Sequence, residues 1–247
     1  MIASTAPGEA PGPNVDDRVD QGMREQLRRF QAGLQAGCPR VGWKIGITTA
    51  AARRPHGLSA PVIGWLDGRR TFASGDAVPL SSVAKVRAEG ELAMYLDRPI
   101  GAESSLVEVR KAIAMVGPAI EFIDLNMPKD DIAVILGHSI FHDAVIFGPR
   151  WPVTVLDHNQ SVLPVGRRNG KCVRTPEPAM IPPDLAALVM LVARTLARYG
   201  ESLEAGDRII SGSYIVPLVV EPGDVIEVDF GFLGKVSANT AVMCAPV

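Results

Sequence analysis

Hydrophobic and polar positions separate a helical N-terminal segment from a strand-rich remainder. Between residues 17 and 36, apolar side chains recur every three or four positions, at Val19, Met23, Leu27, Phe30 and Leu34. This spacing predicts a helix with one apolar side, and Gly37 and Pro39 predict its end. Residues 1–16 are rich in Pro, Gly and Ala and are expected to be disordered, so residues 17–247 are predicted to form a single catalytic domain with an N-terminal helix.

Two further helices are predicted within the strand-rich part. In residues 104–116, Ser105 and Glu108 have the spacing of a capping box, in which each side chain bonds the backbone N–H of the other residue. Residues 182–200 begin with prolines, carry arginines late and end at Gly200, which is the usual order of helix boundary signals.

The remaining segments are short runs rich in Val and Ile, separated by Gly-Asp pairs at residues 75–76, 206–207 and 223–224. Each pair predicts a tight turn, because glycine tolerates positive φ and the aspartate can bond the backbone that follows. The prediction is therefore a mixed α+β domain, mostly β, with a few covering helices.

Composition narrows the classes of partner. Charged residues make up 21% and aromatic residues 5%, with a net charge of -2, so a nucleic-acid partner is not expected. The cysteines, Cys38, Cys172 and Cys244, lack paired spacing and are expected to be free thiols. The apolar helical stretch at 185–193 stops at Arg194, too short to cross a membrane, and the prediction is a cytoplasmic protein.

Candidate chemistry begins in the segment KVRAEGELAMYL, residues 85–96. On a strand, Glu89 and Glu91 would point to the same face and their carboxylates would converge. The segment is also rich in helix formers, and on a helix the two acids would be a solvated surface feature on nearly opposite sides. The residues of this segment alone leave both interpretations open.

A third acid, Glu121, lies in the apolar segment GPAIEFID. A buried carboxylate needs a partner or a cation, because an isolated buried charge is costly. Three converging carboxylates favour a cation with oxygen ligands, Mg²⁺ or Mn²⁺, over zinc. Asp124 would face the other side of a straight strand, and either a structural role or a role in supporting the metal ligands is predicted for it.

The order of these motifs resembles the hydratase branch of the fumarylacetoacetate hydrolase superfamily. The matching pieces are VGWKIGITT from Val41, the Glu-x-Glu pair, PAIE-x-x-D, and the long segment from Leu203 to Ser237. The resemblance implies a rolled mixed β-sheet with flanking helices and a homo-oligomer. It also implies that Glu89, Glu91 and Glu121 bind Mg²⁺ or Mn²⁺, that Lys44 is catalytic, and that Ser213 contacts the substrate.

The sequence departs from the family pattern at two places. Where the family carries Asp-Asn-x-Ser, residues 137–144 read GHSIFHDA, and Phe141 takes the position of the serine. The segment 59–64 carries Ala60 and no acid, where hydratases often have one. Both changes are expected on the substrate side and predict an apolar pocket wall that includes Phe141. On a strand, His138 and His142 would share a face. His142 is a candidate catalytic residue, whereas the role favoured for His138 is that of a surface histidine or one whose hydrogen bonds the protein satisfies.

The implied reaction uses a 2-oxo acid or its dienol, whose carboxylate and 2-oxo oxygen can chelate the metal while an enolate forms. Hydration as in 2-oxopent-4-enoate hydratases is the first expectation. Decarboxylation as in 4-oxalocrotonate decarboxylases, and acylpyruvate C–C hydrolysis, are alternatives that use the same electron sink. A non-catalytic metal-binding partner subunit is the alternative of another class.

Overall fold

Two β-sheets flanked by helices form the computed structural model, which describes residues 17–82, 84–127, 129–158, 162–182 and 184–242. The helices are α1 (Asp17–Gln35), α2 (Ala50–Arg53), α3 (Leu106–Ala112), α4 (Ile132–Gly137) and α5 (Leu185–Ala197). Short 3₁₀ turns lie at Arg54–His56, Gly68–Arg70, Val153–His158, Pro178–Met180 and Gly231–Leu233. The segment 1–16 and Cys244 lie outside the described residues. Among the residues that the structure describes, no helix is long and apolar enough to cross a membrane.

The larger sheet has nine strands in the order β2-β1-β11-β5-β6-β7-β3, with β12 also paired to β5 and β8 to β6. Their bounds are β1 (Arg40–Gly46), β2 (Val62–Asp67), β3 (Thr71–Ala73), β5 (Val86–Leu96), β6 (Ile113–Asp124), β7 (His142–Phe147), β8 (Trp151–Pro152), β11 (Arg208–Ile210) and β12 (Leu218–Val219). The pairs β1–β11 and β3–β7 are parallel, so the sheet is mixed.

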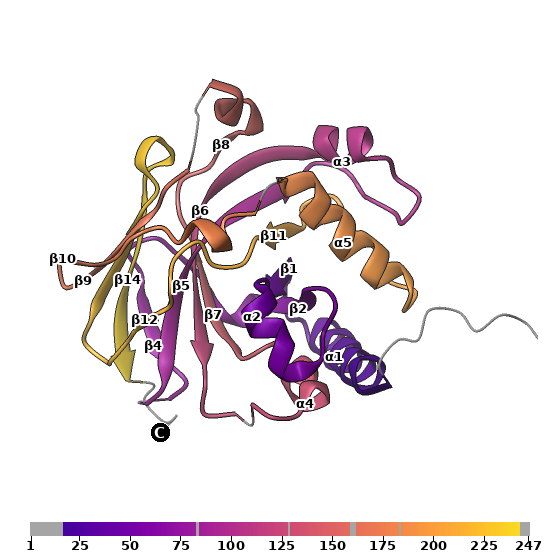
Figure 1. Ribbon diagram of the computed structural model, residues 1–247, viewed down its shortest axis with the longest axis horizontal. Helices are drawn as coiled ribbons and strands as arrows, with labels where there is room; N and C mark the ends of the chain where they lie inside the picture. The colour runs from indigo at the N-terminus through magenta and orange to yellow at the C-terminus, as the bar shows by residue number, and fades with distance from the viewer. Residues whose placement is uncertain (1–16, 83, 128, 159–161, 183, 243–247) are drawn as a thin grey trace, which may run out of the picture.

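The smaller sheet has five strands in the order β10-β9-β13-β14-β4. Their bounds are β4 (Ala77–Leu80), β9 (Val165–Arg168), β10 (Lys171–Arg174), β13 (Val225–Asp229) and β14 (Lys235–Val242). In Figure 1 this sheet lies on one side of the long strands β5 and β6, and helices α1, α4 and α5 lie on the other. The mixed α+β, mostly β class predicted from the sequence is confirmed.

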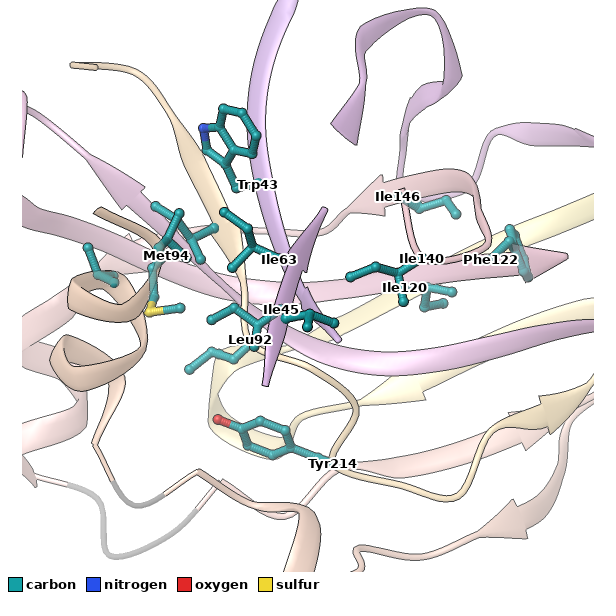
Figure 2. Packing of buried hydrophobic residues seen from close by; sticks show 14 of the residues in the cluster. Trp43, Ile45, Ile63, Leu92, Met94, Ile120, Phe122, Ile140, Ile146 and Tyr214 are labelled. Carbon is teal, nitrogen blue, oxygen red and sulfur yellow. The ribbon is translucent and has the colours of Figure 1, made fainter. Parts of the chain in front are cut away.

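The two faces of β5 serve different purposes. Val86, Leu92 and Met94 point into the main core, where they meet helices α1 and α5 and the smaller sheet. Figure 2 shows part of this core around Trp43, Ile45 and Ile63. Ala93 and Tyr95 point the other way, into a second apolar cluster. Since side chains alternate along a strand, Glu89 and Glu91 share the face of this second cluster.

The second apolar cluster is built from strand residues alone. Its members are Val41, Leu66, Ala93, Tyr95, Ala119, Val145, Phe147 and Ile210, with Met115 packed against them. They come from β1, β2, β5, β6, β7 and β11, and β2 also contacts β7, which is far from it in the order of strands. The sheet is therefore rolled around this cluster, as the family resemblance implied.

Helices α1 and α5 confirm the predictions for their segments, but the helix predicted over 104–116 is shorter. The capping box of Ser105 and Glu108 is present. The helix ends at Ala112, because Ile113 has extended backbone angles (φ -75°, ψ 95°) and begins β6. Pairing with β5 decides this, since Met115 lies directly opposite Tyr95.

The three Gly-Asp turns form as predicted, with one difference in their hydrogen bonds. Gly75, Gly206 and Gly223 have φ of 93°, 93° and 91°, which a side chain would strain. The aspartates were expected to bond the backbone that follows. Each instead accepts a hydrogen bond from the N–H three residues before it, at Ala73, Glu204 and Glu221. The carboxylate thus closes the turn onto the incoming chain, and that part of the prediction was wrong.

Candidate metal centre

Strands β5 and β6 bring the three predicted acids together. Glu89 lies directly opposite Glu121 in the antiparallel register, and Glu91 lies two residues along on the same face. One oxygen of each carboxylate lies within 4.8 Å of the others. The strand interpretation of the Glu-x-Glu segment is confirmed, because pairing with β6 and β11 overrides the helix propensity of its residues.

Lys44 is part of the same cluster. It lies on β1, and its side chain is 2% exposed. Its Nζ lies 2.5 Å from Oε1 of Glu121 and donates a hydrogen bond to the carbonyl of Ile140 at 3.0 Å. The buried ammonium therefore has the anionic partner that the apolar segment around it required.

His142, the first residue of β7, approaches the same carboxylate from another side. Its Nδ1 lies 2.8 Å from Oε1 of Glu121. An ionised carboxylate can only accept hydrogen bonds, so Nδ1 carries the proton in this contact. The opposite nitrogen, Nε2, is buried and has no hydrogen-bond partner among the described residues.

Two carboxylate oxygens of the cluster are buried without a partner. Glu91 accepts a hydrogen bond from the N–H of Gly212 through Oε2, while its Oε1 has none. Glu121 uses Oε1 for Lys44 and His142, while its Oε2 has none. Buried unsatisfied oxygens are rare and costly, and a divalent cation would satisfy both. An all-carboxylate donor set fits the hard cations Mg²⁺ and Mn²⁺.

The charges of the cluster shift its acids in opposite directions. Burial and the charge of Glu121 raise the pKa of Glu89 to about 7. Burial, with Glu121 and Glu89 nearby, raises the pKa of Glu91 well above its ordinary value. Burial also acts to raise the pKa of Glu121, but the Lys44 cation and the hydrogen bond from His142 outweigh it and hold this pKa below its ordinary value. Without a cation, the cluster therefore favours the protonated forms of Glu89 and Glu91, and a metal competes with these protons.

These shifts predict a pH-dependent stabilisation by metal. A carboxyl whose pKa is raised on folding stabilises the folded chain at low pH, and this contribution is lost as the pH rises through the folded pKa, about 7 for Glu89. Above that pH Glu89 is ionised, so a cation no longer has to expel its proton. We expect Mn²⁺ at about 1 mM to raise the melting temperature more at pH 8 than at pH 6.

Calorimetric titration in buffers of different ionisation enthalpy checks the same point. Proton release on Mn²⁺ binding should be larger at pH 6 than at pH 8. Equal melting shifts at both pH values, together with no proton release at pH 6, would show that the three acids are not the cation site.

The segment that delivers the Ile140 carbonyl and His142 has an unusual backbone. Ser139, Ile140 and Phe141 all have positive φ, of 54°, 54° and 63°. Left-handed geometry costs a non-glycine residue about 1–3 kcal/mol, and such geometry gathers at functional sites. Ser139 Oγ donates to the Trp65 carbonyl at 2.5 Å, and a Cβ added at Gly64 would lie 2.7 Å from this Oγ. Glycine at position 64 therefore gives this segment room beside Lys44.

A cavity of about 210 Å³ opens beside Glu89. Its walls come from the end of β1 and the residues after it, from α2, and from the loops around residues 180 and 212–217, and the lining residues are Ile45, Gly46, Ile47, Thr48, Thr49, Ala52, Glu89, Met180, Gly212, Ser213 and Pro217. The predicted substrate-contacting residue Ser213 lies on this wall, where its hydroxyl donates to the carbonyl of Ile215 at 2.7 Å.

The two departures from the family pattern lie away from this cavity. Phe141 is half-buried against the main core and is not among the residues that line the cavity. Ser59 and Ala60 line a different depression, with Met23 and Tyr199. A role for Phe141 in substrate binding stays a prediction, and the structure gives the cavity an apolar wall through other residues.

His138 does not share a strand face with His142, and it has the role of a hydrogen-bonded histidine that was favoured for it. It is the C-terminal cap of helix α4, and its Nδ1 lies 3.0 Å from the carbonyl of Val134 in the same helix. The left-handed residues 139–141 then separate the two histidines. Asp124 has the structural role predicted for it, since it accepts from the N–H of Asn126 at the end of β6.

Comparison with known proteins agrees with this geometry. No known family's sequence profile matches the chain. The 2-oxo-hept-4-ene-1,7-dioate hydratase of Escherichia coli is 31% identical over 208 residues, covering 80% of this chain and 78% of that protein. The 2-keto-4-pentenoate hydratase of Paraburkholderia xenovorans is 29% identical over 240 residues, covering 92% and 84%.

A solved structure gives the same result for the fold. The 4-oxalocrotonate decarboxylase of Pseudomonas putida G7, complexed with magnesium and adipate, superposes with a TM-score of 0.81 at 26% identity, covering 90% of this chain and 86% of that one. The chain belongs to the fumarylacetoacetate hydrolase superfamily, in its branch of hydratases and 4-oxalocrotonate decarboxylases.

Proposed function

We propose that this chain is a divalent-metal-dependent lyase that acts on a small 2-oxo acid or its dienol, by hydration of a substrate of the 2-oxopent-4-enoate type. The observation that carries the proposal is the buried cluster of Glu89, Glu91 and Glu121 around Lys44, with two carboxylate oxygens left free. The hydratases among its relatives support the choice of reaction.

Glu89, Glu91 and Glu121 would hold Mg²⁺ or Mn²⁺. When bound, the cation supplies Lewis acidity toward the carboxylate and 2-oxo oxygens of the substrate. The magnesium complex of the Pseudomonas putida decarboxylase supports this choice of ion. The N–H of Gly212 donates to Glu91 and fixes its side chain. Glycine is required at position 212, because its φ is 86° and a Cβ there would lie 2.5 Å from the Thr48 side chain.

Lys44 and His142 are the residues available for proton movement. Lys44 uses two of its three N–H groups, toward Glu121 and the Ile140 carbonyl, which leaves one to donate to a substrate oxygen. His142 holds its proton at Nδ1, so the free Nε2 can accept one. Glu121 fixes the orientation of both side chains and thereby links the metal site to the acid–base groups.

Decarboxylation is the second candidate. The fold match to the Pseudomonas putida decarboxylase supports it, and both reactions need electrons to flow toward the 2-oxo group. The same lysine and histidine would serve either one. The predicted homo-oligomer and the cytoplasmic location remain predictions.

The test is turnover by the purified protein with Mg²⁺ or Mn²⁺. Two substrates are offered: 2-hydroxypenta-2,4-dienoate, followed by loss of diene absorbance, and 4-oxalocrotonate, followed by release of CO₂. We expect metal-dependent loss of the diene that EDTA abolishes and added metal restores. A folded protein that binds Mn²⁺ and turns over neither substrate would overturn the proposal in favour of a non-catalytic metal-binding subunit.

A further inference from the structure

We infer that this site selects 2-oxo acids whose tail carries no charge, and discriminates against those with a second carboxylate. The inference rests on the proposed function, because it takes the cavity beside Glu89 as the place of the substrate tail. It goes further by naming the substrate class, which is not decided by relatives that include both a pentenoate and a heptenedioate hydratase.

Among the described residues that line the cavity, none supplies a positive charge. Glu89 is the one ionisable residue among those that line it. The others offer aliphatic side chains at Ile45 and Ile47, hydroxyls at Thr48 and Thr49, and the backbone of glycines. A carboxylate bound there would give up hydrogen bonds to water and would gain hydrogen bonds from threonine hydroxyls alone. A buried charge without an ionic partner is strongly disfavoured.

Two arginines close along the chain are directed to backbone carbonyls, and a third, Arg54, is exposed and is not among the residues that line the cavity. Arg53, next to the lining residue Ala52, donates to the carbonyl of Thr48. Arg87, two residues before Glu89 on β5, donates to the carbonyl of Val86 at 2.9 Å. Neither lines the cavity. The ammonium of Lys44 is directed to Glu121 and the Ile140 carbonyl, so it also leaves the tail without a counter-ion.

The charges of the whole site point the same way. Glu89, Glu91 and Glu121 carry three negative charges when ionised, and Lys44 with a divalent cation carries three positive ones. The loaded site is therefore neutral, and a 2-oxo acid with one carboxylate brings a single negative charge. A second carboxylate would add another negative charge beside Glu89, with no cation to balance it.

The far wall suits an apolar tail of variable shape. Met180 and Pro217 line it, with Ala52 from helix α2. Methionine is flexible and fits irregular apolar groups.

An uncharged tail also affects which reaction is possible, because vinylogous decarboxylation releases CO₂ from a second carboxylate on the substrate. A site that excludes that carboxylate favours hydration.

The experiment compares two unreactive acids by calorimetry on the Mn²⁺-loaded protein at pH 7.5, where both are fully ionised: 2-oxopentanoate, with an uncharged tail, and 2-oxoadipate, with a second carboxylate. We expect 2-oxopentanoate to bind at least about tenfold more tightly. Equal affinities, or tighter binding of 2-oxoadipate, would overturn the inference and leave the proposed function standing. Binding of neither acid would overturn both.

A variant tests the location of the tail. Ala52 is exposed on the short helix α2 and lines the cavity, so a longer side chain there can extend from solvent toward the tail. Ala52→Lys should improve 2-oxoadipate affinity by about tenfold, while Ala52→Met, of similar length without charge, should not. If the lysine variant gives no gain over the methionine variant, the tail does not lie in this cavity and the inference is wrong.

Discussion

Glu91→Gln is expected to lower the affinity for Mn²⁺ by about 100-fold or more and to remove turnover, because a ligand matters at least as much as the outer groups that orient it. Glutamine preserves the size of the side chain, and its single oxygen can still accept the Gly212 N–H. The position of the free Oε1 is then taken by an amide NH₂, which presents hydrogens to the cation. Calorimetric titration with Mn²⁺ measures the loss.

The matched control is Glu103→Gln, which removes one exposed acid just before helix α3 and should leave Mn²⁺ affinity unchanged. Glu91 is a better target than Glu121, because loss of the Glu121 charge would leave Lys44 buried without its anion. Breaking such a pair from one side costs about 3–5 kcal/mol and would confuse folding with binding. Wild-type Mn²⁺ affinity in a folded Glu91→Gln protein would refute the site.

Lys44→Met is expected to bind Mn²⁺ as tightly as the wild type or more tightly, and to turn over substrate on the order of 100-fold more slowly. Removal of the ammonium takes a positive charge away from Glu121, so the electrostatic attraction for a cation increases. The proton donor proposed for the reaction is lost at the same time. Steady-state rates with Mn²⁺ at saturation, beside Mn²⁺ titration of the same preparation, separate the two effects.

Lys44→Arg distinguishes the roles of Lys44, because arginine retains the charge but does not give up a proton near neutral pH. Slow turnover in both variants assigns proton movement to Lys44, and recovery in the arginine variant assigns charge pairing. Turnover at the wild-type rate in a folded Lys44→Met protein would exclude Lys44 from the chemistry.

Much of the site was predictable because its chemistry depends on strand register. Once residues 85–96 and 117–124 pair as antiparallel strands, Glu89, Glu91 and Glu121 must share one face. The local sequence does not decide between helix and strand here, because Ala, Glu, Leu and Met favour a helix when taken alone. The order of the motifs along the chain resolved this, and the pairing of β5 with β6 gives the physical reason.

The parts that were missed depend on contacts between distant segments. The left-handed run at 139–141 contains no glycine, so nothing local announces it. It forms because the N–H groups of Ser139 and Ile140 donate to carbonyls of helix α4, while the Ser139 hydroxyl donates to the carbonyl of Trp65 on β2. For the same reason His138 and His142 do not lie on one strand face, the alternative that the sequence had left open for them. The helix over 104–116 was extended too far because the pairing of β6 with β5 starts at its last turn.

Apart from Glu89 and Ser213, the residues that line the cavity beside Glu89 were also not predicted from the sequence. Phe141 and Ala60 stood out because they depart from a family pattern, which reports what relatives carry there and does not give a position in space. Ala52 and Met180 both line the cavity, although 128 positions separate them along the chain. Their proximity depends on the path of the loop before α5, for which the sequence pattern offered no signal.

The side chains that fill the inside of the rolled sheet limit access to the three acids. Along β5 the acids are followed inward by Ala93 and then Tyr95, and Arg208 lies over Phe147 at 4.6 Å and over Tyr95 at 5.6 Å. The rings of Tyr95 and Phe147, tilted by 57° with centroids 6.0 Å apart, and the Arg208 guanidinium thus fill the rolled sheet beyond the acids. Under the proposed function, substrate and product would share the opening beside Glu89, and accumulated product would compete with substrate for entry.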